Sequence, residues 1–144
     1  MKSVKDIMAT DLTICKLDDE LSKVANEMKN HDVGAIPVCE ENRELIGMVT
    51  DRDLVLRGYA AKKDGSAKIR EVMSDDLYTA DPGMSVQEAS KFMAEKQIRR
   101  LPIVENGKLI GIVSLGDLAL ERKSNDAAGQ ALEEISEHHH HGIH

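Results

Sequence analysis

The chain has 144 residues, of which 41% are hydrophobic, and a net charge of −7, which is the balance of a globular protein about one domain in size. The acidic charge and the scarcity of aromatic residues (no Trp, one Phe, two Tyr) argue against nucleic acid as a partner, because phosphate-backbone binders present basic faces and single-strand binders use aromatic platforms. No apolar run approaches the roughly 18 residues of a membrane span, and the first residues lack the apolar stretch of a signal peptide, so we expect a cytoplasmic protein with no membrane partner.

The chain begins with a pattern typical of a short strand followed by a helix. The strand is expected near 13–15. Asp18 and Asp19 are candidate caps for the helix, because a carboxylate accepts hydrogen bonds from the free amides of a first turn. The apolar residues that follow have the spacing of one helical face: Leu21, Val24, Ala25 and Met28.

Two apolar runs, 35–39 and 45–49, then flank a short polar segment and predict a hairpin. A helical pattern follows over 51–58. Residues 1–58 therefore predict one unit with the order strand, helix, strand, strand, helix. The charged segment 59–68 is interpreted as a polar linker.

The same order begins again after the linker. A short strand is expected near 78–80, and Ser85 and Glu88 have the spacing of a capping box, in which each side chain bonds the backbone amide of the other residue. The helix behind this box has an apolar face made of Val86, Ala89, Phe92 and Met93.

Asn106-Gly107 between two apolar runs predicts a tight hairpin, because both residues tolerate positive φ. A helix over 116–122 completes a second unit spanning 69–123. A further amphipathic helix is expected within 124–137, and the histidine-rich residues 138–144 are interpreted as a purification tag.

The two halves are copies of one unit. At a shift of 65 residues Met8 aligns with Met73 and Pro37 with Pro102; after a one-residue gap in the hairpin, Leu45-Ile46-Gly47 aligns with Leu109-Ile110-Gly111. A three-stranded sheet with two helices covers only one of its faces. Two such units can bury their open faces against each other, so we predict an α/β (α+β) fold of two repeats packed with pseudo-two-fold symmetry.

Each copy carries a hydroxyl and a carboxylate three residues apart where a strand gives way to a helix: Thr50 and Asp53, then Ser114 and Asp117. This spacing alone favours a capping box. It also suits a ribose-phosphate site, because an Asp can accept bonds from ribose hydroxyls and a helix start attracts anions. Gly47 and Gly111 lie in the preceding strands, where glycine marks the close approach of backbone or ligand. The two roles of the Asp are compatible.

These residues resemble the cystathionine-β-synthase (CBS) domain family, in the form of the tandem pair called a Bateman module. The resemblance rests on Ile7-Met8 and Val72-Met73, on the strands around Pro37 and Pro102, and on the two hydroxyl–carboxylate motifs. It implies a stand-alone CBS domain-containing protein that binds AMP, ADP, ATP or S-adenosylmethionine, needs no cofactor, forms a homodimer and regulates an unidentified partner protein without catalysing a reaction.

The resemblance also implies two nucleotide sites between the repeats. In the first, Arg99 and Arg100 would face the phosphates of a nucleotide held by Thr50 and Asp53. In the second, Gly34 and Ala35 would face the nucleotide held by Ser114 and Asp117. Adenine would lie against apolar strand residues, which are Ile14, Cys15, Ala35 and Pro37 for one site and Thr79, Ala80 and Pro102 for the other. Without the resemblance, Arg99-Arg100 is an ordinary solvated basic pair.

The remaining residues give no sign of catalysis or metal binding. Cys15 and Cys39 lie within apolar segments and lack metal-ligand spacing, so we expect buried reduced thiols. His31-Asp32 has no activated nucleophile near it, and no phosphate-binding loop or nucleophile elbow is present. The alternative to a nucleotide sensor is therefore a structural or protein-interaction module without significant ligand affinity.

Overall fold

The computed structural model describes residues 2–123. The predicted C-terminal helix (124–137) and the tag (138–144) lie outside the described residues. The described residues divide into two compact units, which we call the Thr50 unit (Asp11–Thr79 with Val104–Ile110) and the Ser114 unit (residues 2–10, 80–103 and 111–123). The Thr50 unit thus contains most of the first repeat with segments of the second repeat. The Ser114 unit contains most of the second repeat with the first residues of the chain.

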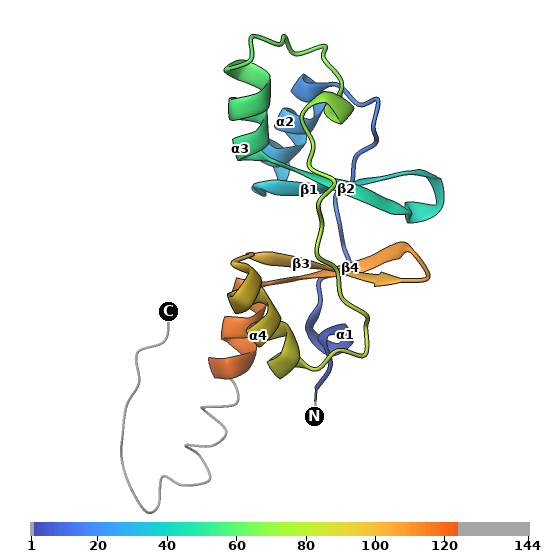
Figure 1. The fold of residues 1–144 in the computed structure, drawn as a ribbon, viewed down its shortest axis with the longest axis vertical. Helices are drawn as coiled ribbons and strands as arrows, with labels where there is room; N and C mark the ends of the chain where they lie inside the picture. The colour runs from blue at the N-terminus through green and yellow to red at the C-terminus, as the bar shows by residue number, and fades with distance from the viewer. Residues whose placement is uncertain (1, 124–144) are drawn as a thin grey trace, which may run out of the picture. The chain divides into compact units, whose positions relative to one another are not determined.

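The Thr50 unit is built on an antiparallel hairpin of β1 (Ala35–Cys39) and β2 (Leu45–Thr50), labelled in Figure 1. Ala35 is opposite Thr50 at one end of the ladder and Cys39 is opposite Leu45 at the other. A 3-10 turn, η1 (Glu41–Arg43), connects the strands. The strand predicted near 13–15 is reduced to a single parallel bridge between Cys15 and Val38.

Helix α2 (Leu21–His31) packs its apolar face into the core of this unit. The core is aliphatic, as the composition requires, and its fully buried members include Val24, Ile36, Val49, Ile69 and Val72. Ile69 belongs to a short 3-10 turn, η3 (Ile69–Glu71), which lies at the end of the linker. Ala67, within the linker itself, also packs against this core.

The prediction that Asp18 and Asp19 cap helix α2 was wrong. The N-cap is Glu20, without a side-chain cap bond, and the first amides donate to linker carbonyls instead: Leu21 N to Ala67 O at 2.9 Å and Ser22 N to Gly65 O at 3.0 Å. Because these carbonyls satisfy the free amides of the first turn, no side-chain cap is needed. Asp18 accepts a bond from Arg70 instead, at 2.7 Å.

The segment after β2 begins as an α-helix, as predicted, and continues as a π-helix. One turn of α-helix, α3 (Asp51–Asp53), is followed by a π-helical segment, η2 (Leu54–Tyr59), in which Ala60 N bonds Val55 O at 2.8 Å. Val55, Leu56 and Tyr59 on this segment are 55%, 50% and 84% exposed, so it leaves an apolar face open.

The Ser114 unit repeats the plan with β3 (Arg100–Glu105), β4 (Lys108–Ser114) and α4 (Val86–Lys96), all labelled in Figure 1, and residues 115–123 are helical. The predicted capping box is confirmed: Ser85 N bonds Glu88 Oε1 at 3.1 Å and Glu88 N bonds Ser85 Oγ at 3.0 Å. The predicted Asn106-Gly107 turn is confirmed by φ values of 54° and 80°. Residues near 78–80 again form a single bridge, between Ala80 and Ile103.

The first residues of the chain complete the Ser114 unit. Helix α1 (Val4–Ile7) places Val4 in a fully buried position, and Val4 N bonds Met84 O at 2.8 Å. Lys2 Nζ lies 2.9 Å from Glu121 Oε1, and this hydrogen bond and charge raise the pKa of Lys2. Since Glu121 is only 7% exposed, Lys2 supplies the counter-charge that a carboxylate so placed requires.

Candidate functional site

Both hydroxyl–carboxylate motifs form complete capping boxes. Thr50 N donates to Asp53 Oδ2 at 2.9 Å, and Asp53 N donates to Thr50 Oγ1 at 3.0 Å. Ser114 and Asp117 repeat both bonds at 2.9 and 3.0 Å. The predicted capping role is therefore confirmed in both copies. Each carboxylate uses Oδ2 for the cap, and within residues 2–123 its Oδ1 accepts no hydrogen bond, so an acceptor remains for a ligand hydroxyl.

The start of the first strand in each hairpin lies beside the motif of the same unit. Asp51 N donates to Gly34 O at 2.9 Å, and Leu115 N donates to Arg99 O at 3.0 Å. Gly34 and Arg99 therefore occupy equivalent places next to Thr50 and Ser114 respectively.

Arg99 and Arg100 are both exposed, and neither forms an ion pair with any residue in the described part of the chain. They belong to the Ser114 unit, whereas Thr50 and Asp53 belong to the other.

The apolar residues expected to contact adenine differ in exposure. In the Thr50 unit Ile14 and Ala35 are half-buried, whereas Cys15 and Pro37 are buried and joined by a bond from Cys15 N to Pro37 O at 2.9 Å. In the second repeat Ala80 and Pro102 are also buried and joined by the equivalent bond at 3.0 Å. Thr79 is exposed. Of the residues expected to contact adenine in the Thr50 unit, Ile14 and Ala35 are thus the partly accessible ones.

The two cysteines are buried free thiols, as the sequence predicts. Burial, together with the nearby carboxylates of Asp19 and Glu27, raises the pKa of Cys15 to about 12. Burial also raises the pKa of Cys39. Since the thiolate is the reactive form, burial and a raised pKa both lower the reactivity of these thiols.

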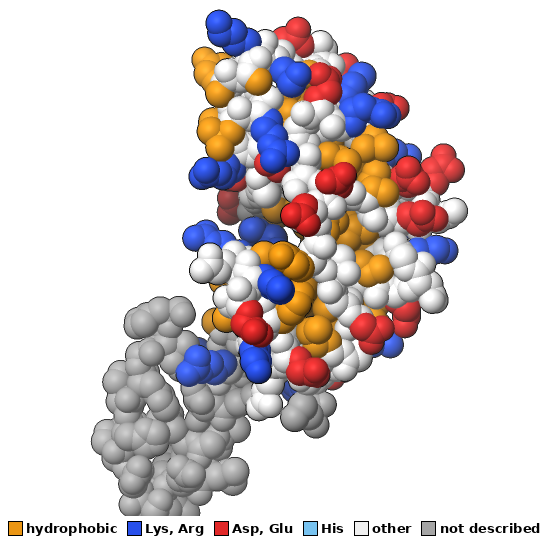
Figure 2. All heavy atoms as spheres, in the orientation of Figure 1, with side chains coloured by type: hydrophobic (Ala, Val, Ile, Leu, Met, Phe, Trp, Pro, Cys, Tyr) orange, Lys and Arg blue, Asp and Glu red, His pale blue; other side chains and the backbone are white. Residues whose placement is uncertain are grey.

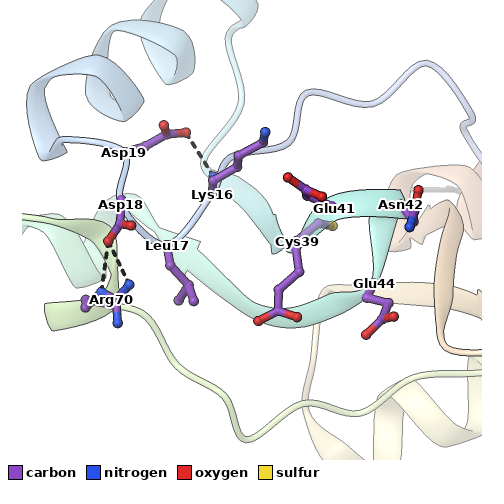
Figure 3. A pocket seen from close by; sticks show the side chains of 10 residues that line it. Lys16, Leu17, Asp18, Asp19, Cys39, Glu41, Asn42, Glu44 and Arg70 are labelled. Carbon is purple, nitrogen blue, oxygen red and sulfur yellow. Dashed lines mark hydrogen bonds and ion pairs between the residues drawn. The ribbon is translucent and has the colours of Figure 1, made fainter.

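A pocket of about 570 Å³ opens in the Thr50 unit at the end of the hairpin away from Thr50 (Figure 3). Arg70 is paired with Asp18 beside it, and Asp19 accepts a bond from the backbone of Lys16. Its lining carries five carboxylates against two cationic side chains, namely Asp18, Asp19, Glu40, Glu41 and Glu44 against Lys16 and Arg70. Because this lining repels phosphate, we do not place the nucleotide there.

The described residues contain no group of three or more His, Cys, Asp or Glu side chains placed to hold a metal ion. Within 2–123, no helix is long and apolar enough to cross a membrane. Acidic and basic side chains are interspersed over the face shown in Figure 2.

Gly47 and Gly111 are needed for the close approach of another segment of the chain. A Cβ on Gly47 would lie 2.8 Å from Ser74 O and 3.0 Å from Met73 Sδ, and a Cβ on Gly111 would overlap Met8. Met73 therefore packs against Gly47, and Met8 packs against Gly111.

Asp51 was not predicted as a site residue, but it lies beside the first motif. Its carboxylate lies against Gly34, since a Cβ built on Gly34 would be 3.2 Å from Asp51 Oδ2. The signal was available in the hairpin register: if Ala35 is opposite Thr50, Gly34 and Asp51 must be neighbours.

Two units, each with a short antiparallel hairpin and a hydroxyl–carboxylate motif at the start of the next helix, define a tandem-repeat module with a duplicated candidate site. A family model described as CBS domain matches residues 4–58 and 69–124, so the chain belongs to the CBS domain family. It is 49% identical to CBS domain-containing protein YhcV of Bacillus subtilis (strain 168) over 144 residues, which are the whole of both chains. It is 38% identical over 120 residues to Hypoxic response protein 1 of Mycobacterium tuberculosis (strain ATCC 25618 / H37Rv), covering 83% of this chain and 84% of that protein.

Solved structures of CBS proteins share the fold. Hypoxic Response Protein I, determined with two coordinated zinc ions, has a TM-score of 0.76 and 37% identity, covering 83% of this chain and 98% of that one. CBSX2 in complex with AMP has a TM-score of 0.78 at 24% identity, covering 88% and 99%. The CBS domain pair of MJ0100, in complex with 5′-methylthioadenosine and S-adenosyl-L-methionine, has a TM-score of 0.75 at 21% identity, covering 87% and 98%.

Proposed function

We propose that this CBS pair is a regulatory module that binds an adenosine nucleotide and acts on a partner protein without catalysing a reaction. The observation that supports the proposal is the duplicated motif, in which Asp53 and Asp117 each cap a helix with one carboxylate oxygen and leave the other without a hydrogen bond among residues 2–123. Support for an adenosine ligand comes from CBSX2 and MJ0100, which share the fold and hold adenosine compounds.

Each motif suits the sugar of a nucleotide. A carboxylate can accept bonds from both the 2′- and 3′-hydroxyls of ribose, as acidic residues do in dinucleotide sites. The half-buried Ile14 and Ala35 offer an apolar surface for the flat base in the Thr50 unit. The fixed capping bonds position the carboxylate before a ligand arrives, so little side-chain entropy is lost on binding.

Arg99 and Arg100 are the phosphate-binding residues in this proposal. Each guanidinium presents a fork of donors that matches phosphate oxygens, and neither arginine is committed to an ion pair among the described residues. The pair would serve the nucleotide held by Thr50 and Asp53. The nucleotide held by Ser114 and Asp117 would face Gly34 and Ala35 instead.

The exposed apolar residues support an assembly in which copies of the chain pair. Leu56 and Leu120 occupy equivalent positions of the two repeats and are 50% and 68% exposed, and Val55 and Tyr59 extend the first patch. Burying such residues is favourable, and a two-fold homodimer is the commonest way to do so. Ligand binding would regulate a partner by shifting the geometry of this assembly.

The same patches favour a second candidate function, a protein-interaction module without useful ligand affinity. Thermal unfolding with AMP, ADP, ATP and S-adenosylmethionine separates the two. Ligand at a hundred times its Kd stabilises the native state by about 2.7 kcal/mol, or about 5–10 °C for a chain of this size. The absence of any shift at millimolar concentrations of all four would favour the interaction module.

The matched control is the double variant Asp53→Asn with Asp117→Asn. An asparagine oxygen can still accept the capping bond, so the unliganded variant should unfold within a few degrees of the wild type. The loss of both charges should abolish most of the ligand-induced shift. An undiminished shift in this variant would exclude the two motifs as the ribose sites.

A further inference from the structure

In each unit, a segment that opens one repeat pairs with a strand of the other repeat. Ala9 exchanges two backbone bonds with Ile112 of β4, at 2.9 and 3.0 Å. Ser74 exchanges two backbone bonds with Met48 of β2, both at 2.9 Å. Each pairing is internal to one unit, the first to the Ser114 unit and the second to the Thr50 unit.

The first opening segment, residues 2–9, is also clamped to the helix that carries Asp117. Lys2 Nζ donates to both carboxylate oxygens of Glu121, at 2.9 and 3.2 Å. Glu121 follows Asp117 by four residues in the helix formed by residues 115–123, so the two side chains lie on one face about a turn apart. Glu121 is only 7% exposed. Since a buried carboxylate requires its counter-charge, loss of the Lys2 ammonium would drive this part of the helix towards solvent.

The second opening segment, residues 72–74, is clamped to the helical segment that begins at the other motif. Arg57 Nη1 donates to Val72 O at 3.4 Å and to Met73 O at 3.2 Å. Arg57 follows Asp53 by four residues and lies in η2. A guanidinium is a strong donor to carbonyl oxygens, because its charge assists the hydrogen bond. This side chain therefore ties the residues just beyond the capping box to the segment that pairs with β2.

The two clamps occupy the same position of the repeat and carry opposite charge. At the shift of 64 residues that aligns Asp53 with Asp117, Arg57 aligns with Glu121. The positive side chain meets carbonyl oxygens and the negative side chain meets an ammonium group, so each has a partner of complementary polarity. What repeats is thus a contact between an opening segment and the residue four places after the carboxylate.

We propose that Glu121 and Arg57 are positioning residues, which couple the ligand affinity of each motif to the docking of the opening segment in the same unit. The inference rests on the proposed function, in which Asp117 and Asp53 contact ribose. A docked opening segment holds the residue about one turn beyond the carboxylate and so fixes the place of the carboxylate. Because coupling free energies are reciprocal, bound ligand would strengthen the docking of that segment. The opening segments would thereby make site occupancy available to a partner protein.

The test isolates one site at a time and measures affinity by calorimetry. The probe is whichever of AMP, ADP, ATP and S-adenosylmethionine binds the wild type most tightly. In an Asp53→Asn background, which leaves the site of the Ser114 unit, Lys2→Met should weaken probe binding about three- to thirtyfold. In an Asp117→Asn background, which leaves the site of the Thr50 unit, the same change should alter affinity by less than about twofold.

Arg57→Met is the mirror-image variant. It should weaken probe binding about three- to thirtyfold in the Asp117→Asn background and by less than about twofold in the Asp53→Asn background. All variants are compared at a temperature at which each is folded. A merely structural role would weaken both sites or neither, so the opposite site selectivity of the two variants identifies positioning.

Two controls separate the clamp from the loss of one positive charge. Lys5→Met removes a charge from the same opening segment, where Lys5 is exposed and forms no ion pair among the described residues, and it should change neither affinity. Lys2→Arg keeps a cationic donor and should restore the affinity of the wild-type residue.

Hydrogen exchange gives a second readout, which does not need the clamp variants. In the Asp53→Asn protein, saturating probe should slow exchange of the Ala9 and Ile112 amides more than that of the Met48 and Ser74 amides. In the protein that keeps only the other site, the order should reverse. Equal protection of both pairs would contradict the coupling.

The outcomes distinguish this inference from the proposed function. If none of the four ligands binds the wild type, the proposed function fails and this inference fails with it. If the wild type binds, only this inference is overturned by clamp variants that spare both sites or weaken both equally. An effect of Lys5→Met as large as that of Lys2→Met, or a failure of Lys2→Arg to restore affinity, would overturn it as well.

Discussion

Replacing Gly47 by alanine should destabilise the protein, because the added methyl group has no room. Its Cβ would lie 2.8 Å from Ser74 O and 3.0 Å from Met73 Sδ. Ser74 is joined to Met48 by two backbone bonds, each 2.9 Å long, so the carbonyl cannot retreat without stretching them. The segment that opens the second repeat must therefore shift away from β2.

The size of the effect follows from these contacts. Overpacking a well-ordered site costs about 1–3 kcal/mol, and each weakened backbone bond has a net value of about 1 kcal/mol. We expect Gly47→Ala to lower the free energy of unfolding by about 1–3 kcal/mol. For a chain of this length, that corresponds to a loss of about 3–9 °C in Tm.

Urea and thermal unfolding of the full chain measure this change, and Gly116→Ala provides the matched control. Gly116 lies in the helix formed by residues 115–123, and the nearest atom to its added Cβ is Ser114 Oγ at 3.5 Å, an ordinary contact. Because alanine favours the helix by up to about 1 kcal/mol over glycine, this variant should be as stable as the wild type or more so. A Gly47→Ala protein as stable as the wild type would refute the reasoning.

Three further predictions concern the arginine pair, the thiols and the assembly. Arg99→Ala, with Arg100→Ala as its companion, should weaken AMP binding at least tenfold and leave adenosine binding nearly unchanged, whereas Asp53→Ala should weaken the binding of both ligands. Equal affinities for AMP in the wild type and the arginine variants would show that the two arginines are only solvated surface residues. Cys15 and Cys39 should resist a thiol reagent in the native protein and react on unfolding, and rapid labelling of the native protein would contradict their burial. Because burial raises the pKa of Cys15 to about 12, the free energy of unfolding should fall as pH rises from about 9 towards 12. Light scattering should give twice the monomer mass of 15.9 kDa, and a monomer at working concentrations would exclude the homodimer.

Features fixed by neighbouring residues could be predicted from the sequence. The capping boxes at Ser85, Thr50 and Ser114 depend on side chains three residues apart, and the Asn106-Gly107 turn depends on two residues that accept positive φ. The repeat itself was visible as a shift of aligned motifs. These features place both hydroxyl–carboxylate motifs at helix starts, which is the part of the candidate site that local chemistry decides.

Features fixed by distant residues could not be predicted. Asp18 and Asp19 look like caps for α2, but the amide of Leu21 bonds Ala67 O, which belongs to the linker. Val4 contributes to the core of the Ser114 unit through a bond to Met84 O, although it precedes the first repeat's strands in the chain. No local pattern encodes either partner, because each contact is made by segments brought together only in the folded chain.

The most direct test of the account is calorimetric titration of the wild-type protein with AMP, ADP, ATP and S-adenosylmethionine, repeated on the Asp53→Asn and Asp117→Asn variants. We predict saturable binding of at least one of these ligands, with each single variant removing one site per chain and the double variant removing both. Each lost charge-assisted ribose bond corresponds to about 1.5–3 kcal/mol, or at least tenfold in Kd. Absence of heat with all four ligands, or unchanged stoichiometry and affinity in the double variant, would contradict the assignment of the duplicated motif as a nucleotide site.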